Sequence, residues 1–269
     1  MTLKFLSPSF RTRYLSILGL VENLSKHHSL TTTLNIGCGE GDYDRALTPY
    51  CTTLHSGDLN PYDVAFCKEA NKDLAIRYQE LDAENLPFQD EAFDCILCIE
   101  VLEHVNSIEK SLQNIQRALK KGGLLIITVP NSRFPFTYDP INTILNLFNI
   151  SLPIGAYAYG HQKLITEETL EQQLATYGLT LLKKEHLSHY LVGFFEMYWA
   201  GLAQALFKHN SKNTLKRTNK KLVLRSITLN PPKILLSIID TLIQLDEDLF
   251  KKSKRSIGFL LFLQKTTSQ

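Results

Sequence analysis

The sequence lacks a long uncharged apolar segment, and none of its helix-like stretches cleanly reaches the about 20 residues that a membrane-spanning helix needs. It also lacks the pattern of a secretory leader. The apolar stretch 15–21 is short, closely follows Arg11 and Arg13, and has no small-residue cleavage site after it. Its apolar positions fit one face of a helix, which we place at residues 11–27. We therefore expect a cytoplasmic protein.

Cysteine is scarce, with five residues in the chain, and an odd number scattered through strand-like segments argues against a disulfide framework. Cys95 and Cys98 match C-x-x-C, but no second pair of Cys or His stands at zinc-ligand spacing. Both lie in an apolar run. We interpret them as buried strand thiols.

The bulk composition is that of an ordinary globular protein, with 44% hydrophobic and 21% charged residues in 269. The net charge of +2 is unevenly distributed. Residues 1–150 carry 13 Lys and Arg against 18 Asp and Glu, a net charge of −5, and the remainder carries 16 against 9, a net charge of +7. This asymmetry indicates that the C-terminal part meets an anionic partner, either a membrane surface or a nucleic acid.

A glycine-rich segment follows the first strand-like run. Residues 34–36 are β-prone and lead into Gly37, Gly39 and Gly41, and a helical pattern follows at 42–47. This order predicts a buried strand, a tight turn and a helix start, where free N–H groups favour an anion. The spacing is G-x-G-x-G and lacks the G-x-x-G of dinucleotide folds.

An acid ends the second predicted strand. Asp58 lies 21 residues beyond Gly37, where a carboxylate accepts hydrogen bonds from the ribose hydroxyls of a nucleoside. The alternative is a turn or N-cap Asp, because Asn60 and Pro61 follow at once.

The pattern of strand and helix then repeats. The predicted strands after the glycine loop are 52–58, 75–81, 93–99 and 124–129. A helix begins at about Ser107, with Asn106 as its N-cap. The segment 34–131 therefore predicts a doubly wound parallel sheet with ligands at the carboxyl ends of the strands.

Five features stand in the same order and spacing as in a known family. They are the G-x-G-x-G loop with Glu40, Asp58, Asp82 followed by Ala83, Phe-Asp at 93–94, and Glu-His at 103–104. This pattern resembles class I S-adenosyl-L-methionine-dependent methyltransferases, particularly the type 11 branch and the quinone-biosynthesis O-methyltransferases. The resemblance implies an α/β, Rossmann-like sheet of seven strands, mostly parallel with an antiparallel last strand.

The resemblance also implies which residues bind the cofactor S-adenosyl-L-methionine. These are Gly37, Cys38, Gly39, Glu40, Gly41, Asp58, Leu59, Asp82, Ala83 and Ile99. For the acceptor side, His104 and His161 are candidate general bases because imidazole titrates near neutrality, and the alternative for each is a structural histidine. In the quinone-biosynthesis branch, Glu100, Glu103 and His104 would bind a divalent metal. Many methyltransferases with Glu-His here use none, and we expect none.

We expect one domain, 1–269, with core segments 31–189 and 255–265. The family joins its last two strands closely, whereas here a helical insertion, 190–254, separates them. It holds an aromatic stretch, a basic run at 208–225 with seven Lys and Arg and no acid, and an apolar helix pattern at 234–249. One interpretation is a helical cap on the core. The other is an in-plane, peripheral membrane element that admits a lipid-like acceptor.

The first functional hypothesis is a methyltransferase acting on a small or lipid-linked acceptor at oxygen. The alternatives are an RNA methyltransferase and a non-catalytic module that binds the cofactor. The basic run 208–225 contains no aromatic residue to stack on bases, so we do not expect a nucleic-acid partner. Asn230-Pro231-Pro232 lies outside the fold position that amino-methylating enzymes use. A nicotinamide dehydrogenase is disfavoured by the glycine spacing and by Asp82.

Overall fold

The computed structural model describes residues 3–132, 134, 147, 165–196 and 231–266. The chain falls into two compact units. One comprises 14–130, 162–185 and 258–269 and contains the sheet; the other comprises 1–13, 131–161 and 186–257 and contains two packed helices. The single domain with an insertion at 190–254 stays a prediction. His161, the basic run 208–225 and most of 131–160 lie outside the described residues.

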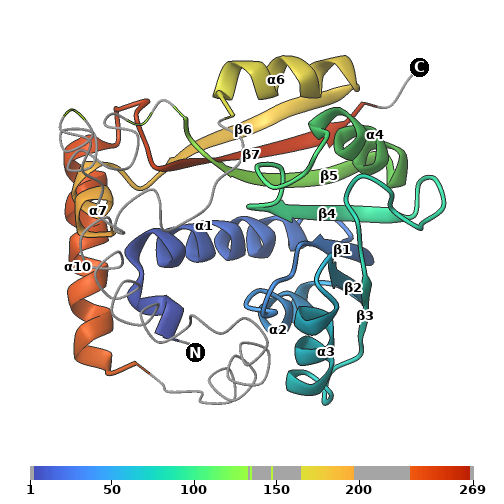
Figure 1. Cartoon of the computed structure of the whole chain (residues 1–269), viewed down its shortest axis with the longest axis horizontal. Coiled ribbons are helices and arrows are strands. Elements are labelled where there is room, and N and C mark those ends of the chain that lie inside the picture. The colour runs from blue at the N-terminus through green and yellow to red at the C-terminus, as the bar shows by residue number, and fades with distance from the viewer. Residues whose placement is uncertain (1–2, 133, 135–146, 148–164, 197–230, 267–269) are drawn as a thin grey trace. The chain divides into compact units, whose positions relative to one another are not determined.

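The sheet has seven strands in the order β3-β2-β1-β4-β5-β7-β6. They are β1 (Thr32–Ile36), β2 (Thr53–Asp58), β3 (Ile76–Glu80), β4 (Phe93–Ile99), β5 (Leu119–Pro130), β6 (Leu179–Leu187) and β7 (Gly258–Lys265). The pairs from β3 to β5 are parallel, and β7 runs antiparallel to β5 (Figure 1). The predicted fold class is confirmed.

The core explains why the central strands are continuous apolar runs. Leu34, Ile96 and Leu125 come from neighbouring strands and are fully buried, because both faces of the sheet are covered. Cys95 and Cys98 are also fully buried, as predicted, and burial raises the pKa of Cys95 to about 12, so it stays a thiol.

Helices cover the sheet on both faces. They are α1 (Pro8–Ser25), α2 (Asp44–Leu47), α3 (Pro61–Ala70), α4 (Ile108–Ala118) and α6 (Glu167–Thr176), with 3₁₀ turns η1 (Leu3–Leu6) and η2 (Thr48–Tyr50). Leu112 and Ile115 of α4 and Leu170 and Leu174 of α6 join the core cluster of the strands. Figure 1 shows α6 above β6, and α1 below β4.

Three boundaries differ from the expectations. Helix α1 begins at Pro8 and ends at Ser25, not at 11 and 27. The N-cap of α4 is Ser107, whose hydroxyl accepts the Lys110 N–H, so the proposed cap at Asn106 is wrong. Strand β5 begins at Leu119 rather than 124, because helix α4 ends one residue earlier and the chain pairs with Phe93 at once.

The second unit is organised by α7 (Tyr190–Phe195) and α10 (Lys233–Phe250). The buried Asp246 carboxylate on α10 accepts the N–H groups of Leu191 at 2.8 Å and Val192 at 3.4 Å. It therefore caps the first turn of α7, where backbone donors have no partner inside the helix. The rings of Tyr190 and Phe250 pack with centroids 4.9 Å apart.

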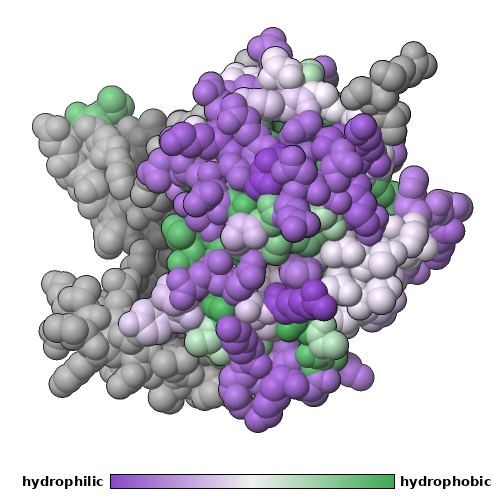
Figure 2. Space-filling view, turned by 90° about the vertical axis from the view of Figure 1, so that its right-hand side faces the viewer, coloured by the Kyte–Doolittle hydropathy of each residue, from purple (hydrophilic) through white to green (hydrophobic). Residues whose placement is uncertain are grey.

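Within the described residues, no helix is both long and apolar enough to cross a membrane. Described side chains on the face shown in Figure 2 are mainly hydrophilic, and the hydrophobic ones form small separate areas there. The large apolar side chains of the sheet lie in the core instead.

Candidate active site

The site residues converge where the strand order reverses. From β1 the chain runs outward to β2 and β3, and it then returns to β4 on the other side of β1. Loops leaving the carboxyl ends of β1 and β4 turn in opposite directions, which creates a crevice for a ligand in doubly wound sheets. All the predicted cofactor residues lie at or just after the carboxyl ends of β1 to β4.

The glycine loop after β1 needs its glycines for different reasons. Gly37, Gly39 and Gly41 all have positive φ, at 72°, 52° and 73°. A Cβ at Gly37 would lie 2.3 Å from Val101 Cγ2, and one at Gly41 would lie 2.9 Å from Cys67 Sγ. Among the residues that the structure describes, a Cβ at Gly39 would meet nothing within 4 Å. The loop thus packs tightly at its two ends and faces open space at its centre.

Backbone hydrogen bonds hold this loop on the end of β2. The Gly37 and Cys38 N–H groups both donate to the Gly57 carbonyl, at 2.8 and 2.9 Å. Gly57 is itself required there, since a Cβ would lie 2.2 Å from the Gln79 carbonyl oxygen of β3. The sequence alone assigns Gly57 no role, although a glycine inside a strand can mark a place where another backbone approaches closely.

The Asp58 carboxylate joins the two loops. Its Oδ2 accepts the Gly39 N–H at 2.9 Å, and its Oδ1 accepts the Asn60 N–H at 2.9 Å. The N-cap of α3 is Asn60, not Asp58. The Asp58 side chain therefore bonds within its own turn as well as to the glycine loop, and its role toward a ribose stays a prediction. Each oxygen accepts one of these backbone bonds, so acceptor capacity for a ligand remains.

The remaining predicted cofactor residues border the same edge. Asp82 is exposed and its carboxylate accepts the Glu84 N–H at 2.9 Å, whereas Ala83 and Ile99 are buried. Leu59 leaves 72% of its surface exposed directly after Asp58. An apolar side chain in this position is available to pack on a ligand.

The segment after β4 holds the Glu-His pair. Glu100 has φ +54°, and its Oε1 accepts the Thr128 hydroxyl at 2.9 Å. Glu103 is buried, and its Oε1 lies 3.8 Å from Nε2 of the half-exposed His104. In the described part of the chain, one group of possible metal ligands has its ligand atoms within 4.8 Å of one another. Glu100, Glu103 and His104 are not that group. The absence of a metal at these three residues remains a prediction.

A buried polar cluster beneath the glycine loop was missed. The Asp44 carboxylate is fully buried and accepts hydrogen bonds from Asn35 Nδ2, Ser56 Oγ and Tyr78 OH, each at 2.8 Å. Desolvation raises the pKa of Asp44, and the three hydrogen bonds oppose that rise. A signal was present, since Asn35 and Ser56 are polar residues within strands that otherwise read as buried.

Two cysteines lie beside Asp44. The hydrogen bond with Cys67, followed by burial, raises the pKa of the Cys38 thiol far above its usual range. The Cys67 thiol donates to the Gly39 carbonyl at 3.3 Å. Cys38 is buried, and its role in binding the cofactor stays a prediction.

The comparisons with known proteins agree with this geometry. Residues 34–127 match the family described as methyltransferase domain. This part of the chain is therefore similar to a methyltransferase domain, which confirms the resemblance drawn from the sequence.

A similar curated protein is the ubiquinone biosynthesis O-methyltransferase of Coxiella burnetii (strain RSA 331 / Henzerling II). It is 32% identical over 151 residues, which cover 55% of this chain and 63% of that protein. The chain thus spans a little under two thirds of the length of this relative.

Solved structures share the fold. The [4+2]-cyclase SpnF has a TM-score of 0.60 at 17% identity. The match covers 94% of this chain and 81% of the SpnF chain. Phosphoethanolamine N-methyltransferase 2 of Haemonchus contortus, in complex with S-adenosyl-L-methionine, has a TM-score of 0.56 at 17% identity. The match covers 95% of this chain and 52% of that protein. At these identities the likeness establishes the fold, and the reaction has to be argued from the site.

The glycine loop predicts a stability difference between two substitutions. Gly37→Ala adds a clash with Val101 to the strain of a positive φ, and we expect it to lower the free energy of unfolding by about 1–3 kcal/mol more than Gly39→Ala. Urea denaturation measures this difference. Val101→Ala in the Gly37→Ala background should recover part of the loss, and equal stability of the two alanine variants would contradict the packing argument.

Proposed function

We propose that this chain is an S-adenosyl-L-methionine-dependent methyltransferase that methylates a small or lipid-linked acceptor at oxygen. The proposal rests on the hydrogen bond that the Gly39 N–H donates to the Asp58 carboxylate. This bond holds an acid beside a glycine loop where the strand order of the sheet reverses. A matched methyltransferase domain over 34–127 and relatives named as O-methyltransferases support it.

The residues present fit the cofactor. The open space beside Gly39 allows a ligand to approach the backbone, and Asp58 retains acceptor capacity for the ribose hydroxyls. Exposed Leu59 offers an apolar surface to the adenine, and Asp82 and Ala83 border it. Ile99 closes the floor at the end of β4.

The cofactor, when bound, supplies an activated methyl group on a sulfonium. The chain then has to align the acceptor oxygen, exclude water and remove a proton. His104 is half-exposed and can meet an acceptor, and the buried Glu103 carboxylate lies 3.8 Å from its Nε2. His161 is the second candidate base and lies outside the described residues.

Helix α10 supports the membrane interpretation of the insertion. Ile234, Ile238, Leu245 and Leu249 recur at helical spacing on one side and are 50–71% exposed. The helix is followed at once by basic residues, which are Lys251, Lys252, Lys254 and Arg255. An exposed apolar stripe beside basic side chains suits an anionic membrane surface, so a lipid-linked acceptor would be reached there.

Binding of S-adenosylhomocysteine tests the cofactor site. We expect Asp58→Asn to weaken its affinity about 10–100-fold, because hydrogen bonds to a charged group contribute about 1.5–3 kcal/mol. Calorimetric titration measures the affinity. Asp94→Asn is the matched control, since Asp94 pairs with Lys120 and lies at the beginning of β4, the strand edge opposite its carboxyl end. Clear binding of NADH with none of S-adenosylhomocysteine would reject the methyltransferase proposal.

Transfer of a tritiated methyl group tests the acceptor class. Incubated with cellular extracts, the protein should label molecules that partition into the organic phase, and Asp58→Asn should reduce the label. We expect His104→Gln to lower kcat by about 10²-fold or more while S-adenosylhomocysteine still binds. An unchanged kcat would remove His104 as the base and leave His161. Label recovered mainly in RNA would contradict the lipid-linked acceptor.

Vesicle co-sedimentation tests the role of α10. The pair Ile238→Glu and Leu245→Glu should reduce binding to vesicles with anionic lipid at least about tenfold, since each buried side chain contributes about 1.5–3 kcal/mol. Ser237→Glu with Gln244→Glu adds the same charge to another side of α10 and serves as the control. Equal loss in both pairs would indicate a charge effect and no insertion of the stripe.

A further inference from the structure

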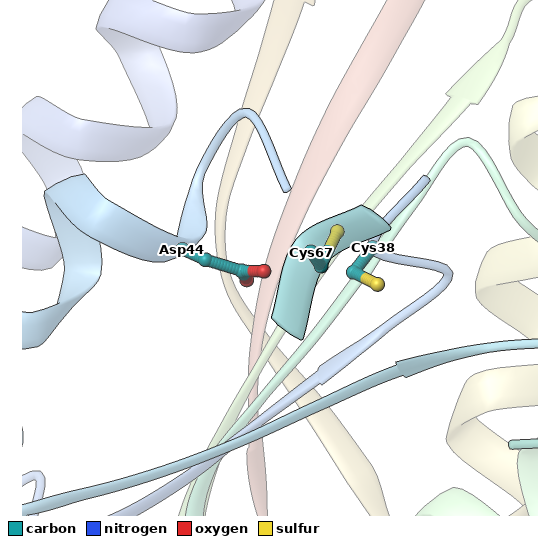
Figure 3. Close-up of side chains that lie close together, drawn as sticks. All are labelled: Cys38, Asp44 and Cys67. Atoms are coloured by element: carbon teal, nitrogen blue, oxygen red, sulfur yellow. The ribbon is translucent and has the colours of Figure 1, made fainter. Parts of the chain in front are cut away.

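Three side chains from three segments meet beneath the glycine loop. Cys38 comes from the loop, Asp44 from α2 and Cys67 from α3 (Figure 3). All three are buried, and one ligand atom from each lies within 4.8 Å of the others. No other group of three or more His, Cys, Asp or Glu residues in the described segments meets this criterion. Neither the cofactor site nor the acceptor chemistry uses this cluster as a whole.

The Asp44 carboxylate presents one of its oxygens to the thiols. Within the described part of the chain, Oδ1 accepts two hydrogen bonds, from Asn35 and Ser56, whereas Oδ2 accepts only that of Tyr78. A Cβ at Gly41 would lie 3.1 Å from Oδ2 and 2.9 Å from Cys67 Sγ. The glycine therefore keeps a side chain out of the space between this oxygen and the sulfur.

A fourth donor lies in the same place. The Gly39 carbonyl oxygen is 3.3 Å from Cys67 Sγ and 3.9 Å from Cys38 Sγ. With Asp44 Oδ2 these atoms make two sulfurs and two oxygens. Tetrahedral sites place sulfur at about 2.3 Å and oxygen at about 2.0–2.2 Å from the ion, so a modest inward movement of the donors would complete such a site.

The charge of the cluster favours a cation. In the described part of the chain the hydrogen-bond donors to Asp44 are neutral, and no Lys or Arg forms an ion pair with it. A buried carboxylate without a cationic partner is costly, and a bound cation is one way to compensate it. Thiolate sulfurs select zinc over magnesium or calcium.

We propose that Cys38, Asp44, Cys67 and the Gly39 carbonyl form a structural zinc site under the glycine loop. Four protein donors leave no position for a substrate, so the ion would tie the loop to α2 and α3 rather than take part in catalysis. Tyr78 orients the carboxylate, and Asn71 donates to the Tyr78 hydroxyl at 2.9 Å, so these two form the supporting shell.

Cobalt is the probe for the test. The full chain, reduced and stripped with a chelator, is titrated with Co²⁺ and followed by absorption. We expect one equivalent to produce the thiolate-to-cobalt charge-transfer band and the visible bands of a tetrahedral site, and Zn²⁺ should abolish both. Cys67→Ser should lose most of the charge-transfer intensity. Cys51→Ser, which removes a half-buried thiol outside the cluster, should retain it.

A second variant keeps the test decisive if Cys67→Ser fails to fold. Tyr78→Phe leaves every donor in place, and we expect Co²⁺ and Zn²⁺ to bind about 10–100-fold more weakly with unchanged circular dichroism. Absence of the charge-transfer band in the wild type would overturn the site. So would an equal band in Cys67→Ser, or a Cys38–Cys67 disulfide whose reduction restores no metal binding.

The experiments distinguish a failure of the zinc site from a failure of the proposed methyltransferase function. Titrating S-adenosylhomocysteine into the same samples shows whether the cofactor site exists whatever the cobalt spectrum is. Cobalt bands without S-adenosylhomocysteine binding would leave the zinc site standing and remove the methyltransferase proposal. The reverse pattern would remove only the zinc site.

Discussion

The hydrogen bonds between the glycine loop and the end of β2 are the constraint on which the site depends. The Gly57 carbonyl accepts two N–H groups of the loop, and the Asp58 carboxylate accepts a third from Gly39. These bonds give direction to a loop whose glycines would otherwise leave it many conformations. They also fix the acid at a constant place relative to the backbone of the loop.

The cluster beneath the loop supports it from the other side. Burying Asp44 is unfavourable, and its hydrogen bonds to Asn35, Ser56 and Tyr78 offset that cost. One of these donors comes from each of β1, β2 and β3. All three hydrogen bonds can therefore form only when the three strands are correctly aligned. A polar group of this kind favours one arrangement of the sheet over its near alternatives.

Strand positions were predictable from local pattern. The run 93–99 and the strand ending at Asp58 match the structure because burial on both faces demands continuous apolar residues and glycine marks the turn. Local pattern failed at element ends. Asn106 and Ser107 both suit an N-cap, and only the backbone path chose Ser107. Gly57 was passed over because its neighbour, Gln79, lies on another strand.

By itself, the sequence determined the class of fold and the positions of its strands along the chain. These depend on periodicity and on residue types at short spacing, which a single chain carries openly. Only the tertiary structure decided that Cys38, Asp44 and Cys67 meet, and that Gly37 packs on Val101. Such contacts join residues from separate elements, and the distance between them is set by how the strands and helices pack.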